Sequence, residues 1–239
     1  MPALSPAVFV PGALAVMPAQ MSTTDPVAMA FVIVFLVISL GLHEMAHAWV
    51  ALKCGDPTAR DLGRITVNPI VHIDLFMTIL LPAMLYIFSN GSMVFGGAKP
   101  VPVAYHRLRK PLRDMMLVAI AGPLTNFLLA ILFYAAWKGL VYTDLYEPDQ
   151  RLPRVLAGCV GFNILLTVFN LIPIPPLDGS RVMRWLLPQS VRESYDVLER
   201  FGMLILIVLI FGVPGFQGLI QDGMRSAFDM IHFLTGGQW

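Results

Sequence analysis

The chain has 239 residues, of which 57% are hydrophobic and only 13% are charged. A soluble domain is normally about a quarter charged, so this composition with its long apolar runs excludes an ordinary soluble protein and indicates an integral membrane protein. The net charge of +1, without a stripe of basic residues interleaved with aromatics, predicts no nucleic-acid partner. Two cysteines are too few for a disulfide framework or a cysteine-ligated metal site.

Residues 1–26 contain five prolines and neither Lys nor Arg. A secretory signal peptide begins with a basic region, so we do not expect this segment to be one. We interpret it as an N-terminal tail, with Met21 as an alternative start of translation.

Apolar stretches suited to helices follow in chain order at residues 27–53, 70–90, 112–140, 155–173 and 201–220, with a shorter amphipathic one at 222–235. Segments rich in Gly, Pro and charge separate them, and no internal repeat is visible. The sequence therefore predicts an all-α fold, a polytopic membrane helical bundle. We divide it into the tail 1–26, a transmembrane core 27–220 and a C-terminal amphipathic segment 221–239.

Residues 43–47 read HEMAH and place three ionisable groups in the first apolar stretch. Residues four apart share one face of a helix, so His43 and His47 can present two imidazoles to one ion. Glu44 completes the HExxH zinc motif, in which the carboxylate stays off the metal and serves as a base. Zinc lowers the pKa of its water to about 7, which suits attack on a peptide carbonyl. The alternative is side chains that satisfy one another within a bundle, but ionisable groups inside a membrane are costly and usually functional, which favours the metal site.

A catalytic zinc site needs a third protein ligand, and Asp178 in FNLIPIPPLDGSR is the best candidate. Three prolines between residues 173 and 176 end a helix before it, and Gly179 permits a sharp turn that can direct the carboxylate inward. Unwound backbone at membrane depth is tolerated where it is buried or lines a water-filled cavity, as hydrolysis requires. The alternative is a surface Asp-Gly turn at a helix end.

A shared ion constrains the topology, because the helix that carries the histidines and the helix before Asp178 must then end on one side of the membrane, called side A. Simple crossings by both 70–90 and 112–140 would place those ends on opposite sides. We therefore predict that residues 70–110 enter and return to side A. This unit would be a re-entrant helix at 70–90 and a short extended, β-like membrane segment through VFGGAKPVPV, whose glycines, prolines and β-branched residues suit a strand or loop.

The distribution of basic residues tests this topology independently. Side A carries eleven of them: Lys53, Arg60, Arg64, Arg107, Arg109, Lys110, Arg113, Arg181, Arg184, Arg192 and Arg200. The opposite side carries three, Lys138, Arg151 and Arg154, together with Asp144, Glu147 and Asp149. Cytoplasmic loops are enriched in Lys and Arg, so we expect the site to open toward the cytoplasm, with the N-terminus outside.

The sequence resembles the site-2 protease family of intramembrane zinc metalloproteases. The resemblance rests on HEMAH at 43–47, GRITVNP at 63–69, FGGAKPVPV at 95–103, AGPLTN at 121–126 and NLIPIPPLDG at 170–179. These motifs occur in the family's order, and the resemblance spans about residues 30–190. The chain is similar to the compact branch of the family, which lacks the PDZ and nucleotide-binding regulatory domains of some members.

The resemblance implies that His43, His47 and Asp178 ligate one zinc ion per chain and that Glu44 is the catalytic base. It also implies that Asn170 positions the substrate or polarises its carbonyl, a role open to a neutral amide donor. An Asn that hydrogen-bonds between helices is an equal alternative. Asn126 would be a structural group or one that supports the metal ligands, and Gly122-Pro123 a packing and kink device.

The extended segment is a candidate strand for binding substrate by β-augmentation, with the residues Gly96, Gly97, Ala98, Lys99, Pro100 and Val101. Such binding matters because a helical peptide bond is shielded, so the substrate helix must unwind before hydrolysis. Many relatives have Trp where this chain has Gly97, a departure that would alter the groove without touching the zinc chemistry.

We therefore expect an intramembrane zinc endopeptidase whose partners are a transmembrane protein substrate and membrane lipid, in a bacterial or archaeal plasma membrane. One alternative is a metal-ion transporter that uses His43, His47 and Asp178 as a transit site, although transporters often contain repeats and none is visible. Another is a catalytically silent homologue that binds helices, against which the intact Glu44 argues. The sequence indicates no oligomeric state.

Overall fold

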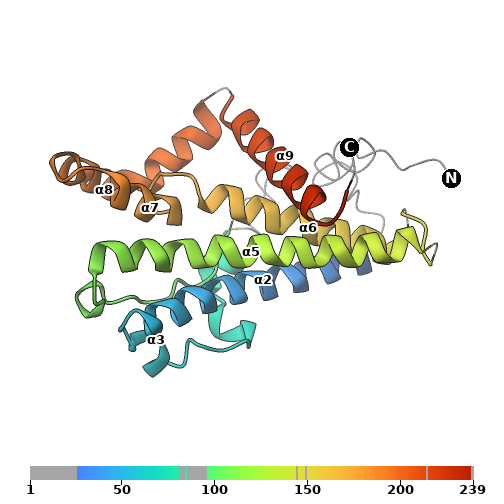
Figure 1. Ribbon diagram of the computed structural model, residues 1–239, viewed down its shortest axis with the longest axis horizontal. Coiled ribbons are helices and arrows are strands. Elements are labelled where there is room, and N and C mark those ends of the chain that lie inside the picture. The colour runs from blue at the N-terminus through green and yellow to red at the C-terminus, as the bar shows by residue number, and fades with distance from the viewer. Residues whose placement is uncertain are drawn as a thin grey trace. The chain divides into compact units, whose positions relative to one another are not determined.

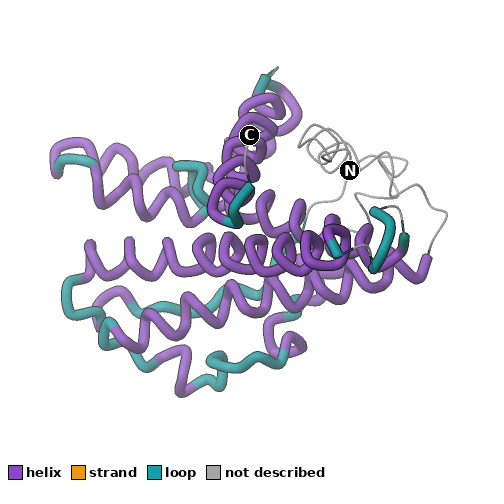
Figure 2. The backbone as a smooth tube through the Cα atoms, turned by 45° about the vertical axis from the view of Figure 1, so that its right-hand side comes forward, coloured by secondary structure: helices purple, strands orange, loops and turns teal. Residues whose placement is uncertain are grey.

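The computed structural model of the protein describes residues 26–80, 84, 96–143, 145–148, 150–213 and 215–237. Seven α-helices occur among them: α2 (Pro26–Lys53), α3 (Thr58–Asp61), α5 (Pro111–Tyr142), α6 (Arg151–Asn170), α7 (Asp178–Leu186), α8 (Gln189–Gly212) and α9 (Phe216–Leu234). Figures 1 and 2 show helices and connecting loops, and the described residues include no β-strand. The predicted all-α fold class is confirmed.

Three helices are long and apolar enough to cross a membrane, because their sequences are nearly free of charge. They are α2 from Ala30, α5 and α6, with mean hydropathies of 1.8, 2.2 and 1.7. The described part of the chain provides up to four spans if α8 and α9 together count as one. Long apolar helices of this kind support the predicted multi-pass membrane protein.

The helices predicted at 27–53 and 112–140 are confirmed to within two residues by α2 and α5. The α5 helix continues through Pro123, so this proline does not end it. In the predicted 70–90 helix, the described residues form a 3₁₀ turn at Pro69–His72 and a π-helical turn at Leu75–Leu80. Most of residues 81–95 lie outside the described residues, and the re-entrant course of this segment stays a prediction.

The prediction of a single helix at 201–220 is wrong. The α8 helix ends at Gly212 and α9 begins at Phe216, with Gly215 between them in the left-handed conformation at φ 94°. Residues other than glycine rarely adopt that conformation, which explains why one helix cannot run through this point. Sequence analysis predicted no helix between Asp178 and Arg200, but α7 and the start of α8 lie there, and their charged side chains pair with each other.

The chain forms two compact units, and α2 and α5 each contribute residues to both. In the unit made of residues up to 36, 126–168 and 215 onward, α5, α6 and α9 pack around Tyr134, Ile164 and Phe228. Tyr134 Oη lies 2.8 Å from Nδ1 of the buried His232, and Asn126 Nδ2 donates to Asn163 Oδ1 at 3.0 Å. Asn126 thus forms a hydrogen bond between helices, as expected for the structural one of its two predicted roles.

The other unit comprises residues 37–125 and 169–214. It gathers the second half of α2, the first half of α5, the end of α6, and α7 and α8. Side by side in Figure 1, α7 and α8 are in contact. All the residues predicted to bind metal lie in this unit.

Candidate metal centre

The α2 helix presents the two histidines of HEMAH together. His43 and His47 lie one helical turn apart, and their Nε2 atoms are 3.0 Å from each other. Both side chains belong to buried residues, with exposed fractions of 5% and 8%. Two buried imidazoles that converge through the same ring nitrogen are arranged as ligands of one ion rather than as exposed helix residues.

The second ring nitrogen of His47 fixes its tautomer. Nδ1 of His47 donates to the Val118 carbonyl of α5 at 2.7 Å, and a carbonyl can only accept. The neutral ring therefore carries its proton on Nδ1 and exposes the lone pair of Nε2 toward His43. Metal-ligating histidines are commonly oriented by such a bond to a backbone carbonyl.

Asp178 completes a triangle of ligand atoms. Its Oδ2 lies 3.2 Å from His43 Nε2 and 3.3 Å from His47 Nε2, and this buried atom accepts no hydrogen bond from the residues that the structure describes. Asp178, the third residue of the predicted ligand set, therefore lies beside the histidines although it follows His47 by 131 residues in the sequence.

The carboxylate reaches this position because α6 ends at Asn170 and α7 begins at Asp178 itself. A Cβ atom on Gly179 would lie 2.2 Å from the Leu171 carbonyl oxygen, so only glycine allows α7 to start against the end of α6. We predicted a sharp turn at Gly179, but Gly179 does not adopt a positive φ. Close backbone approach is the reason for glycine here.

Gly122 of α5 faces the same triangle. A Cβ atom at this position would lie 2.4 Å from His47 Nε2 and 2.5 Å from His43 Nε2. Sequence reasoning predicted packing at Gly122-Pro123 but not this contact with the ligands. The only sequence signal is a small residue inside a long apolar helix.

The three ligand atoms fit a zinc ion. Zinc bonds to histidine nitrogen and carboxylate oxygen of about 2.0–2.2 Å in tetrahedral geometry place neighbouring ligand atoms about 3.3 Å apart. The observed separations are 3.0, 3.2 and 3.3 Å. Two histidines and one carboxylate also form a catalytic rather than a structural donor set, because a fourth position stays open.

Glu44 lies beside the triangle without being its third corner. Ligand atoms of His43, Glu44 and His47 all lie within 4.8 Å of one another. Glu44 Oε2 accepts a hydrogen bond of 2.8 Å from the backbone N–H of Val101. The carboxylate of the motif is thus held by the candidate substrate strand, close to where water would be activated.

A second carboxylate, Asp56, is fully buried in the turn after α2 and binds the backbone three residues beyond the candidate strand. Asp56 Oδ2 accepts from the Ala104 N–H at 2.6 Å, and Oδ1 accepts from the N–H and hydroxyl of Thr58. Burial raises the pKa of Asp56, but these hydrogen bonds and the charge of Arg107 outweigh it, so the pKa lies below its usual value. Sequence reasoning missed this residue, although Asp-Pro-Thr is a pattern typical of side chain-to-backbone turns.

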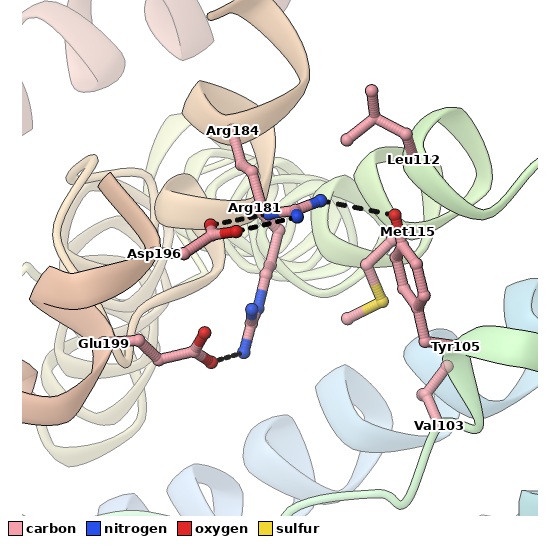
Figure 3. A pocket seen from close by; sticks show the side chains of 8 residues that line it. All are labelled: Val103, Tyr105, Leu112, Met115, Arg181, Arg184, Asp196 and Glu199. Carbon is pink, nitrogen blue, oxygen red and sulfur yellow. Dashed lines mark hydrogen bonds and ion pairs between the residues drawn. The ribbon is translucent and has the colours of Figure 1, made fainter. Parts of the chain in front are cut away.

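A pocket of about 300 Å³ is lined in part by Val103 and Tyr105, which follow the candidate strand in the chain (Figure 3). Arg184 of α7 donates to both carboxylate oxygens of Asp196 in α8, at 2.7 and 2.9 Å, and to Tyr105 Oη at 3.2 Å. Arg181 pairs with Glu199 of α8 in the same pocket. The α7 helix, which begins with Asp178, therefore bonds both to α8 and to Tyr105.

The structure says less about Asn170 and about the predicted substrate strand. Asn170 is the half-buried last residue of α6, eight residues before Asp178, and its predicted role stays a prediction. Residues 96–104 form no regular strand.

The sequence matches Peptidase family M50 over residues 31–146 and 147–213. It is 37% identical over 187 residues to "Putative zinc metalloprotease YwhC" of Bacillus subtilis, which covers 76% of this chain and 80% of that protein. Identity to the similarly named Rip2 of Mycobacterium tuberculosis is 32% over 213 residues, 87% of this chain and 78% of Rip2. No solved structure matches.

Proposed function

Because this chain belongs to peptidase family M50, the site-2 proteases, and is a zinc-dependent metalloprotease of the membrane, we propose that it hydrolyses a peptide bond within or near a transmembrane segment of another membrane protein. The observation that carries this proposal is the position of the site. His43, Glu44 and His47 lie within the apolar helix α2, which is long enough to span a membrane. A substrate that reaches them must approach from the membrane or its surface.

In this proposal one zinc ion per chain is held by His43, His47 and Asp178. When bound, zinc polarises the substrate carbonyl and acidifies water. Val118 keeps the His47 ring in the ligating tautomer, and Gly122 leaves room for both rings. The Val118 hydrogen bond and the space at Gly122 support the ligand assignment, because two helices that only packed together would need neither.

Glu44 is the proposed general base. Since its Oε2 is held by the Val101 N–H, the other carboxylate oxygen, Oε1, takes the proton of the attacking water. Glu44 then passes this proton to the leaving amine. A fixed carboxylate is a more effective base than a freely rotating one, because its orientation does not have to be established in each turnover.

The substrate would lie extended along residues 96–101, with the Asn170 amide as a donor to the developing oxyanion. The extended course matters because local unwinding exposes the carbonyl that a helix shields. Asn170 supports this role by its place at the end of α6, on the short link to Asp178. The proposed partners are thus a transmembrane protein and the surrounding lipid.

We also propose that the site opens toward the cytoplasm. In the sequence, eleven basic residues flank the segments assigned to side A, whereas Lys138, Arg151 and Arg154 flank those assigned to the opposite side. This segregation supports the orientation through the positive-inside rule. The membrane would be a bacterial or archaeal plasma membrane, since the relatives named above are bacterial.

The proposal is tested with purified protein in detergent and a panel of single-span membrane proteins. Wild type, Glu44→Gln and the control Glu147→Gln, an exposed acid between α5 and α6, are compared for bound zinc and for a cleaved fragment. We expect all three to bind zinc and only Glu44→Gln to be inactive. Zinc binding without cleavage of any panel protein would contradict the protease proposal and direct attention to zinc transport in proteoliposomes. Absence of zinc from wild type would contradict the metal centre.

A further inference from the structure

Two segments of the chain meet where two membrane spans end. The α2 span ends at Lys53, and the α5 span begins at Pro111. The Arg109 N–H, two residues before α5, donates to the carbonyl of Cys54, the residue after α2, at 3.1 Å. The ends of spans lie at the boundary between hydrocarbon and lipid headgroups, so the side chains of this meeting point lie at headgroup level.

The meeting point carries an excess of positive charge. Residues 53–64 and 104–114 contain seven Lys or Arg and three Asp, which gives a net charge of +4 with neutral His. Two of the cations form ion pairs, Arg60 with Asp61 and Arg113 with Asp114. Four other exposed cations form no ion pair with the residues that the structure describes, and we refer to them as the basic surface: Lys53, Arg107, Arg109 and Lys110.

An exposed aromatic ring lies beside the basic surface. The Trp49 side chain, one helical turn before the end of α2, is 52% exposed, and Lys53 Nζ lies 5.3 Å from the centroid of its ring. A Cβ atom on Gly55 would lie 3.2 Å from Arg109 Cγ, so the Arg109 side chain lies against the turn that follows Lys53. Tryptophan and basic side chains are enriched together at the membrane–water interface.

We propose that the basic surface binds the headgroups of anionic phospholipids. The oxygens of a phosphodiester accept hydrogen bonds from ammonium and guanidinium groups, and a guanidinium can donate two parallel bonds to them. Lipid is favoured over a soluble anion because both basic segments adjoin span ends, where headgroups are always present. The inference goes beyond the proposed protease function and does not depend on it.

The competing explanation is that these cations only fix the orientation of the chain during insertion, as the positive-inside rule describes. Orientation requires no preference among lipids once the protein is assembled. Binding of headgroups requires anionic lipid to be enriched beside Trp49 in the finished protein. The two explanations therefore differ in a property that can be measured.

The test uses full-length protein reconstituted in vesicles of phosphatidylcholine with a minor fraction of phosphatidylglycerol. Either the phosphatidylglycerol or an equal amount of the phosphatidylcholine carries brominated acyl chains, which quench the fluorescence of a nearby tryptophan. The contribution of Trp49 is the difference between each protein and its Trp49→Phe counterpart. We expect the anionic lipid to associate about 5-fold more strongly than phosphatidylcholine, the effect of one cation at a lipid surface.

Matched variants separate local binding from net charge. Arg109→Gln/Lys110→Gln leaves Lys53 over the reporter ring and should bring the ratio of the two association constants close to unity. Arg154→Gln/Arg225→Gln removes the same charge from exposed positions on α6 and α9 and should keep the wild-type ratio. Arg109→Lys/Lys110→Arg retains both charges and should also keep it. Bound zinc and size-exclusion chromatography check that each variant is folded.

Equal quenching by the two brominated lipids in wild type would overturn the proposal. A ratio that persists in Arg109→Gln/Lys110→Gln, or that falls equally in Arg154→Gln/Arg225→Gln, would also overturn it. Wild type alone provides a second measurement, because raising the salt concentration from about 0.1 M to about 1 M shortens the Debye length from about 10 Å to about 3 Å. The preference for anionic lipid should decline over this range, and a preference that does not change with salt would contradict binding by exposed cations.

Discussion

Replacing Gly122 by alanine adds one carbon atom at the point where the structure leaves room for two imidazoles. The new Cβ would lie 2.4 Å from His47 Nε2 and 2.5 Å from His43 Nε2. Ordinary contact distances are about 3.5 Å, so the rings must retreat by roughly 1 Å. Metal sites tolerate deviations of only about 0.2 Å in ligand distance, so at least one imidazole is lost as a ligand.

The expected loss of zinc affinity is therefore at least the 10- to 100-fold, about 1.4–2.8 kcal/mol, typical of changes to groups that merely orient a ligand. The helix itself should not suffer, because alanine is about 0.8–1.0 kcal/mol better than glycine in a helix interior. The matched control is Gly139→Ala on the same helix, where a Cβ would meet nothing within 4 Å among the described residues. That variant should keep its zinc and gain slightly in stability.

The assay is competition with a chelator of known affinity, followed by zinc analysis of the purified proteins, with size-exclusion chromatography and thermal unfolding as checks of folding. Gly122→Ala should remain folded and release zinc at a chelator concentration that leaves Gly139→Ala loaded. Equal zinc retention by the two variants would refute the geometry described here, since the rings could then not occupy the space beside Gly122.

Three further predictions concern the elements around the centre. Asp178→Asn keeps the size of the side chain but removes its charge, so zinc affinity measured by the same competition should fall at least 10-fold; unchanged affinity would exclude it as a ligand. Asp56→Asn should lower the unfolding free energy at neutral pH by about 1–3 kcal/mol. Folding lowers the pKa of Asp56, so the stability that its carboxylate contributes is fully present above the unfolded pKa of about 3.9 and is lost as pH falls through the folded pKa. Thermal unfolding across pH should therefore show the stability difference between wild type and Asp56→Asn shrinking below about pH 4. A difference that stays constant would contradict this account. Gly202→Ala places a Cβ 2.4 Å from the Pro175 carbonyl oxygen and should lower Tm by several degrees, whereas Gly218→Ala, with no atom of the described residues within 4 Å, should not; equal Tm values would show that α8 can move away.

His43, His47 and Asp178 could be proposed from the sequence because each follows from a local rule, and the structure places their ligand atoms within 3.3 Å of one another. The spacing of His43 and His47 needs only the helical period, and a membrane makes their polarity conspicuous. Asp178 followed from the prolines that end α6. The geometry at Gly122 could not be predicted in this way, because a glycine in an apolar helix has many uses and its partners lie 75 and 79 residues earlier in the sequence.

The α7 helix shows the same limit of local rules in the fold. Its sequence, DGSRVMRWL, contains a glycine and several polar residues, so apolar content alone does not indicate a helix. Its Arg184 and Arg181 find acids on α8, and these tertiary pairs supply what local propensity lacks. The end of α8 was misplaced because the apolar run continues to Ile220, although the Pro214-Gly215 pair is typical of a turn.

The central claim is a zinc centre formed by two histidines and one aspartate, with Glu44 beside it and not bound to the metal. Zinc K-edge X-ray absorption on purified wild type and Glu44→Gln tests this claim most directly. The account predicts one zinc ion per chain in both proteins, two imidazole nitrogens at about 2.0–2.1 Å, oxygen as the remaining ligand atom and no sulfur. A sulfur ligand, or loss of a protein ligand in Glu44→Gln, would contradict it.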